Sequence, residues 1–175
     1  MAILRAFRGM QPRIGKNVYL AENVVLIGDV TVEDDCSIWW GSVLRGDCGS
    51  IVVGRGSNIQ DGCMLHATTD HSTTVLGPNV SVGHHAIVHG ARVAQGALIG
   101  MKSVLLDLAY VGEYSIVAAG AVVAEGMEVP PHTLVAGVPA KIKKALPAGN
   151  EKARLGHAQE YRDLAAWYLT SGDGR

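Results

Sequence analysis

The sequence has few aromatic residues, no excess of one charge and no long apolar run. Only 5% of its 175 residues are Phe, Trp or Tyr, and phenylalanine occurs once, whereas glycine occurs 22 times. A core of this composition must be narrow and aliphatic. The formal net charge is −1 with acids and bases interspersed, so neither nucleic acid nor an anionic membrane is an expected partner. We also expect no membrane span and no signal peptide.

Cysteine is scarce too. The chain has three cysteines, an odd number, and no CxxC pair. This usage favours a reduced, cytoplasmic setting over a disulfide-bonded secreted one. The length suits one domain with an appended element.

Aliphatic residues recur every six positions along most of the chain. Insertions interrupt the series after position 44 and around 70–74, and one residue is dropped after position 88. The anchors of this repeat are Ile14, Leu20, Leu26, Val32, Ile38, Leu44, Val53, Ile59, Leu65, Leu76, Val82, Val88, Val93, Ile99, Leu105, Val111, Val117, Val123, Val129 and Val135. A period of six fits neither an amphipathic helix nor one alternating strand.

The repeat predicts a parallel β-helix over residues 10–140, with three short strands and about 18 residues in each coil. The anchors would fill the interior, and the glycine that often follows an anchor would permit turn geometry. A small residue often stands four positions after the anchor. Because Cys36, Cys48 and Cys63 occupy this slot, we expect all three in the core.

The repeat stops after Val135, and a C-terminal helix is predicted over residues 150–170. Asn150 could cap a helix that starts at Glu151, and Ser171 with Gly172 could end it. The helix should pack on the β-helix or on a neighbouring subunit. Its apolar residues at helical spacing are Leu155, Ala158, Tyr161, Leu164, Ala165 and Tyr168.

Five of the seven histidines fall between positions 66 and 89. His66 and His89 each follow an anchor of the same face, one coil apart, so their imidazoles should stack and could converge on one metal ion. His84 falls near a corner of the preceding face and is poorly placed to join them within one chain. A threefold trimer would solve this, because that corner could meet the neighbour's histidine pair.

The same frame gathers other polar residues around the histidines. Arg45, Asp47, Gln60 and Asp61 fall on two neighbouring faces of three consecutive coils. This concentration on an aliphatic repeat indicates a site at a subunit interface. Arg45 and Asp47 could instead form a purely structural ion pair across that interface.

Several segments resemble the γ-class carbonic anhydrase family, a resemblance that covers roughly residues 10–145. The segments are LRGD (44–47), NIQDG (58–62), MLH (64–66), VGHHAIVHG (82–90), IGMKSVLLD (99–107) and VAGVPAKIKK (135–144). The tail EYRDLAAWYL (160–169) is similar to the branch encoded with phenylacetate-degradation and carnitine genes, of which some members are described as thioesterases.

The resemblance implies a homotrimer of left-handed β-helices with metal sites between subunits. His66 and His89 of one chain and His84 of its neighbour would bind Zn²⁺, or else Fe²⁺ or Co²⁺. Three neutral imidazoles leave zinc an open position, where the pKa of water falls to about 7. Such a site could hydrate CO₂ to bicarbonate.

The resemblance also implies roles for the polar residues. Gln60 would orient the nucleophile and substrate, Arg45 and Asp47 would bridge subunits, and Asn58 and Asp61 would support the site.

The chain departs from the family where protons leave the site. Cys48 and Gly49 stand where glutamates are usual, and the inserted loop 67–74 has Asp70 as its one acid. His71 in this loop is expected to be exposed, with proton transfer as an alternative role, and His85 is expected to point away from the site. Activity could therefore be low.

Three other functions fit the sequence. A metal-dependent acyl-CoA thioesterase would use the same histidines. A hexapeptide acyltransferase would need one histidine as a general base and no metal, and the fold does not discriminate against it. A non-catalytic homologue would retain the metal site as a relic.

Overall fold

The computed structural model describes residues 1–147 and 149–171. Its strands are β1 (Ile3–Arg5), β2 (Arg13–Ile14), β3 (Tyr19–Leu20), β4 (Val25–Val32), β5 (Ser37–Ile38), β6 (Val43–Val53), β7 (Asn58–Ile59), β8 (Met64–His66), β9 (Thr74–Leu76), β10 (Ser81–Val82), β11 (Ile87–His89), β12 (Arg92–Val93), β13 (Leu98–Ile99), β14 (Val104–Leu105), β15 (Tyr110–Val111), β16 (Ile116–Val117), β17 (Val122–Val123), β18 (Glu128–Val129), β19 (Thr133–Ala136) and β20 (Lys141–Ala145). The helix α1 (Asn150–Ser171) follows them.

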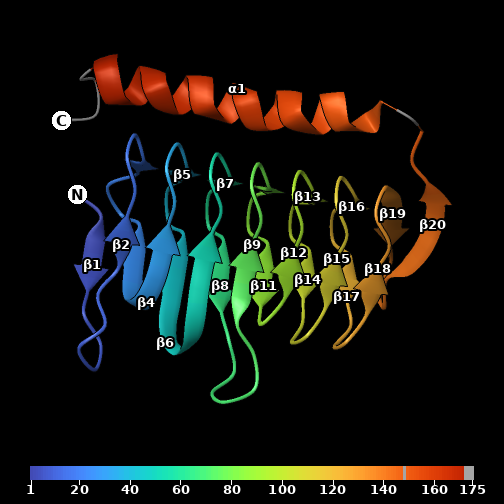
Figure 1. Ribbon diagram of the computed structural model, residues 1–175, viewed down its shortest axis with the longest axis horizontal. Helices are drawn as coiled ribbons and strands as arrows, with labels where there is room; N and C mark the ends of the chain where they lie inside the picture. Colours follow the sequence, from blue (N-terminus) through green and yellow to red (C-terminus); the bar gives the residue numbers. More distant parts are fainter. Residues whose placement is uncertain (148, 172–175) are drawn as a thin grey trace.

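The strands stack into a left-handed parallel β-helix of about seven turns, as the repeat and the resemblance predict (Figure 1). Leu65 lies in register with Leu44 on one side and Val88 on the other, and Ile59 lies beside Val82. The predicted face assignment is therefore confirmed. Every anchor from Leu26 to Val135 is at most 2% exposed. Each coil contacts only its neighbouring coils, so the aliphatic column that they share is the hydrophobic core. Its burial is the main source of stability.

Two faces matter for the site. The histidine face consists of β8, β11, β14 and β17, which follow one another in one sheet. The helix face consists of β3, β5, β7, β10, β13, β16 and β19. Helix α1 contacts β3, β5 and β7 of the helix face and runs back along the β-helix toward its N-terminal end (Figure 1).

The glycines that follow the anchors do not supply the turns, contrary to expectation. Gly54 and Gly83 are not among the positive-φ residues; instead, a Cβ on Gly83 would lie 2.8 Å from the backbone nitrogen of Met101 on the next coil. The left-handed conformation falls two residues later, at Gly56 (φ 69°) after Gly54 and at His85 (φ 59°) after Gly83. Close packing of successive coils therefore excludes a side chain at the position directly after the anchor, where Gly54 and Gly83 stand.

Two strands run through a corner without a break, which the sequence did not predict. β4 and β6 pair over most of their lengths, and Gly28 pairs with Gly46 at the bend. A Cβ on Gly28 (φ 71°) would lie only 2.5 Å from the Gly46 carbonyl oxygen. The two glycines let the backbones approach closely enough to bend together.

The core assignment is correct for Cys36 and Cys63 and wrong for Cys48. Burial raises the pKa of Cys36 and of Cys63 to about 12, which makes both thiols unreactive. Cys48 is only partly buried. The residues inserted after Leu44 extend β6 past the corner, so the position four after the anchor no longer faces the interior.

The helix packs through an aromatic cluster on the helix face. Tyr168 lies 5.3 Å from Tyr19 and 5.6 Å from Trp39 between ring centroids, and Tyr161 lies 5.6 Å from Trp39. Such offset and edge-on contacts between aromatic rings stabilise the packing. Leu164 was expected on this packed face but is 43% exposed.

The start of the helix differs from expectation, and the expected residue after its end cannot be compared. The Asn150 side chain donates to the Tyr114 carbonyl oxygen at 2.6 Å and so fastens the helix to a coil, whereas a cap was expected. Gly172 lies outside the described residues. β20, which pairs antiparallel with β19, was not predicted. Within residues 1–147 and 149–171, no helix has the length and apolarity that crossing a membrane requires.

Candidate metal centre

His66 and His89 face each other on adjacent coils of the histidine face. They end β8 and β11 and are paired in register. His66 Nδ1 lies 3.1 Å from His89 Nε2, and the ring centroids are 5.1 Å apart. The structure thus brings together the two predicted ligands of one chain.

Two carboxylates flank this histidine pair. Asp47 Oδ1 lies 3.1 Å from His66 Nε2 on one side, and Asp107 Oδ2 lies 3.1 Å from His89 Nδ1 on the other. Burial raises the pKa of Asp47, but hydrogen bonds from Arg45 and His66 outweigh it and hold that pKa below its usual value. Burial likewise opposes ionisation of Asp107, and hydrogen bonds from Ser72 and Thr68 outweigh it in lowering the pKa. Both acids are therefore charged at neutral pH.

The carboxylates decide which ring nitrogens carry hydrogen. A charged carboxylate only accepts, so His66 must donate from Nε2 and His89 from Nδ1. The remaining lone pairs, on His66 Nδ1 and His89 Nε2, then point at each other across 3.1 Å. Two acceptors at this distance repel unless a proton or a metal ion lies between them.

A metal ion fits this arrangement. Zinc binds imidazole nitrogen at about 2.0–2.1 Å, so two tetrahedral ligands lie roughly 3.3–3.4 Å apart, close to what the pair shows. A carboxylate that holds the far nitrogen is also the usual partner of a metal-bound histidine.

His84 has the same kind of support but stands apart from the pair. Its Nδ1 lies 2.8 Å from Asp61 Oδ2, which leaves Nε2 as the lone-pair nitrogen. The side chain is 41% exposed, on the helix-face side of the corner after β10. This geometry leaves the nitrogen available to a second chain.

Within one chain, the described residues offer a three-donor cluster of a different composition: Asp47, Cys48 and His66, with ligand atoms within 4.8 Å of one another. Asp47 already accepts from Arg45 at 2.7 and 2.8 Å. A guanidinium this close disfavours a second cation on the same carboxylate. Arg45 and Asp47, expected to act across the interface, thus contact each other within one chain.

Gln60 and Asn58 lie buried on the helix face and are joined by a hydrogen bond. Gln60 Nε2 donates to Asn58 Oδ1 at 3.2 Å. Since the amide nitrogen is held in this way, Gln60 Oε1 remains as the acceptor that the side chain can present. Gln60 is adjacent to Asp61, which holds His84.

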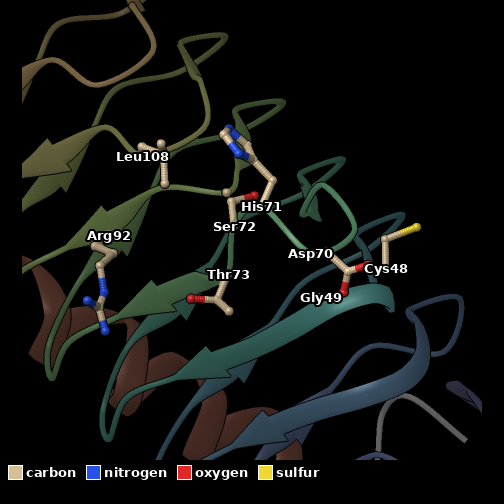
Figure 2. A pocket seen from close by; sticks show the side chains of 9 residues that line it. Cys48, Gly49, Asp70, His71, Ser72, Thr73, Arg92 and Leu108 are labelled. Atoms are coloured by element: carbon tan, nitrogen blue, oxygen red, sulfur yellow. The ribbon is translucent and has the colours of Figure 1, made fainter.

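The inserted loop is fastened to the histidine pair through Asp107. Ser72 donates to Asp107 Oδ1, and Thr68 Oγ1 donates to Oδ2 at 3.1 Å. The loop borders an open cavity of about 530 Å³ whose wall includes Cys48, Asp70, Thr73, Arg92 and Leu108 (Figure 2). His71 is 45% exposed, and its Nε2 lies 3.4 Å from Glu125 Oε1.

Asp107 and Glu125 were not identified from the sequence. Asp107 stands two residues after the anchor Leu105, on the coil that follows His89. Extending the face assignment by one coil would have placed a carboxylate beside His89. No comparable signal exists for Glu125, because its contact depends on how far the loop reaches.

Relatives of this chain include proteins named as carbonic anhydrases. The "Probable carbonic anhydrase" of Methanocaldococcus jannaschii is 40% identical over 152 residues, which cover 87% of this chain and 95% of that protein. Gamma carbonic anhydrase 2, mitochondrial, of Arabidopsis thaliana is 39% identical over 140 residues, 77% of this chain. The match spans 50% of the plant protein's length. The carnitine operon protein CaiE of Escherichia coli K12 is 38% identical over 159 residues, 91% of this chain and 81% of CaiE.

Similar solved structures carry transferase names. A "putative acetyltransferase" of Bacillus cereus superposes with a TM-score of 0.92 at 35% identity, covering 95% of this chain and 96% of that one. A hexapeptide transferase family protein of Anaplasma phagocytophilum gives 0.90 at 35% identity, covering 95% and 98%. No family model matches the chain.

Fold and site together define a hexapeptide-repeat β-helix protein with a carboxylate-supported histidine pair. The relatives then specify the group: the chain belongs to the γ-class carbonic anhydrase-like family of hexapeptide-repeat proteins.

Proposed function

We propose that the protein is a zinc-dependent carbonic anhydrase whose metal sites lie between the subunits of a homotrimer. His66 and His89 of one chain and His84 of the next would hold each ion, with Fe²⁺ or Co²⁺ as possible substitutes for Zn²⁺. The observation that carries the proposal is the pair of facing lone pairs on His66 and His89, set by Asp47 and Asp107.

Exposed apolar side chains support the trimer. Met64 (36% exposed) and Ile87 (39%) are paired in register on the histidine face, two residues before His66 and His89. Leu106 (37%) follows β14 on the same face. An apolar column beside candidate ligands is suited to a subunit interface, because a neighbouring chain would cover it and bring its own His84.

The residues of the site have complementary tasks in CO₂ hydration. His66, His89 and the neighbouring chain's His84 would hold zinc, which would supply the nucleophile for hydration, because zinc held by three neutral imidazoles lowers the pKa of water to about 7. Gln60 Oε1 would accept a hydrogen bond from the attacking water and so orient it. Asp47, Asp61 and Asp107 keep the three imidazoles in the tautomers that bind metal.

Protons must leave the site for turnover to continue. The His71 imidazole would accept the proton, and the Glu125 carboxylate, 3.4 Å from its Nε2, would stabilise the resulting charge. This pair replaces the family's glutamates that the chain lacks. Both side chains are exposed, so the proton passes from them to buffer.

Stopped-flow CO₂ hydration tests the proposal on protein whose zinc content is confirmed at about one ion per chain. Hydration that is lost in His84→Ala is the expected result. His85→Ala is the matched control, because His85 is the adjacent histidine and occupies an exposed corner. Full zinc occupancy without hydration in the wild type would refute the proposal.

A second function, metal-dependent thioester hydrolysis, is favoured by the cavity beside the site. Its volume of about 530 Å³ far exceeds what CO₂ needs. Hydrolysis of an acyl-CoA that depends on His66, His84 and His89 would establish it. Metal-independent acyl transfer would instead support the function suggested by the names of the solved relatives. A cytoplasmic location stays a prediction.

A further inference from the structure

The C-terminal helix has a polar contact with the β-helix that leads to the site. His157 of α1 is partly buried, and its Nδ1 lies 3.0 Å from the hydroxyl oxygen of Ser81. Ser81 belongs to β10 on the helix face and is 2% exposed. A buried serine with a histidine partner is a fixed hydrogen-bonding position.

The contact continues from Ser81 to Gln60. Asn58, paired in register with Ser81, donates from Nδ2 to the Ser81 hydroxyl oxygen at 2.8 Å. Asn58 Oδ1 then accepts from Gln60 Nε2 at 3.2 Å. Three successive hydrogen bonds therefore join the helix to the residue that would orient the nucleophile.

The chain of hydrogen bonds has a direction. Burial lowers the pKa of His157, opposed by the charge of Glu160 and assisted by that of Arg154, so the imidazole is neutral at pH 7. The Ser81 oxygen already accepts from Asn58, so its own hydrogen is free to go to His157 Nδ1. The donors then all point the same way: Gln60 to Asn58, Asn58 to Ser81, and Ser81 to His157.

This direction has a consequence at the site. An amide side chain can turn over and exchange its nitrogen and oxygen, and the two orientations differ in what they offer a ligand. A terminal acceptor on His157 favours the orientation in which Asn58 Oδ1 faces Gln60 Nε2. Gln60 then presents its oxygen to the nucleophile.

We propose that His157 is a positioning residue, which fixes the amide orientation of Gln60 through Ser81 and Asn58. The helix is thereby part of the site as well as a cover for the sheet. The effect on catalysis rests on the proposed function, whereas the hydrogen-bond chain itself does not.

The series of hydrogen bonds from Gln60 to His157 can be tested without an activity assay. Nitrogen NMR of the imidazoles in the full-length protein at pH 7 should show His157 neutral, with hydrogen on Nε2 and a hydrogen-bonded lone pair on Nδ1. The His157→Asn spectrum identifies the signals. Ser81→Ala should shift Nδ1 toward a value without a hydrogen bond. A His157 that is charged, that carries hydrogen on Nδ1, or that ignores Ser81→Ala overturns the proposal.

Kinetics then test the effect on Gln60. His157→Leu removes the acceptor and should lower kcat/KM for CO₂ by roughly 3- to 10-fold, the value of one hydrogen bond, at unchanged zinc content. His157→Asn places an oxygen near the position of Nδ1 and should restore the rate to within about twofold. Arg162→Leu is the control. It removes a different contact between the helix and the β-helix, to Asn79 at 2.6 Å, which takes no part in the hydrogen bonds from Gln60 to His157.

A double-mutant cycle separates positioning from stability. In a Gln60→Ala background, His157→Leu should cause no further loss, since the two residues act together. Equal losses in both backgrounds, or an equal loss in Arg162→Leu, would overturn the positioning role. Absence of hydration in the zinc-loaded wild type would refute the proposed function instead. The NMR result alone would then show whether the hydrogen bonds from Gln60 to His157 exist.

Discussion

Asp107 is the residue whose removal should reveal most about the histidine pair. It accepts hydrogen bonds from His89, Ser72 and Thr68, so Asp107→Ala frees both a candidate ligand and the inserted loop. His89 would then lose the partner that keeps hydrogen on Nδ1 and leaves Nε2 to face His66.

The expected size follows from these contacts. Removing a carboxylate that supports a metal-bound histidine typically weakens metal binding by about 10- to 100-fold. That range corresponds to about 1.4–2.7 kcal/mol. The loss in Asp107→Asn should be smaller, because an amide oxygen in the place of Oδ2 can still accept from His89 and Thr68, while the amide nitrogen in the place of Oδ1 cannot accept from Ser72.

Competition with a chelating indicator measures the zinc affinity of both variants against the wild type. Asp29→Asn is the matched control: it removes an acid that pairs with Arg13 at 2.6 Å on the surface. An Asp107→Ala protein that binds zinc within twofold of the wild type would refute the role assigned to this carboxylate.

Three further predictions concern protons and thiols. His71→Ala and Glu125→Gln should slow CO₂ hydration at low buffer but not at high buffer, and equal slowing under both conditions would remove the pair from proton export. Because the pKa of Asp107 is lowered by folding, its stabilising effect is present above the unfolded value of about 3.9 and is lost as pH falls through the folded value. The difference in unfolding free energy between wild type and Asp107→Asn should therefore shrink below about pH 4 in urea titrations, and a constant difference would contradict this assignment. In thiol titration of the folded protein, Cys48 should react before Cys36 and Cys63, whose pKa values burial raises to about 12; earlier reaction of either buried thiol would contradict the core packing.

The fold was predictable because its repeat is local. Anchors six residues apart determine which side chains face the interior, and stacking of identical units then places Leu44, Leu65 and Val88 in one column. The stacking of His66 on His89 follows from the same frame, since each comes directly after an anchor of that column.

Other features depend on contacts that a repeat does not encode. Cys48 was misplaced because an insertion extends β6 past its corner and changes which residues face inward. Glu125 meets His71 only because a loop reaches across several coils. Asn150 bonds to Tyr114 instead of capping its own helix, a choice set by how the helix is seated. Whether His84 completes the site depends on a second chain.

Subunit complementation tests the shared metal site most directly. His84→Ala and His89→Ala chains should each lack a full ligand set, and each should lose zinc and CO₂ hydration. After unfolding and refolding as an equal mixture, about a quarter of the interfaces should join an intact His66/His89 pair to an intact His84, with zinc and activity recovered in that proportion. A site contained within one chain would recover neither, and that result would contradict the account.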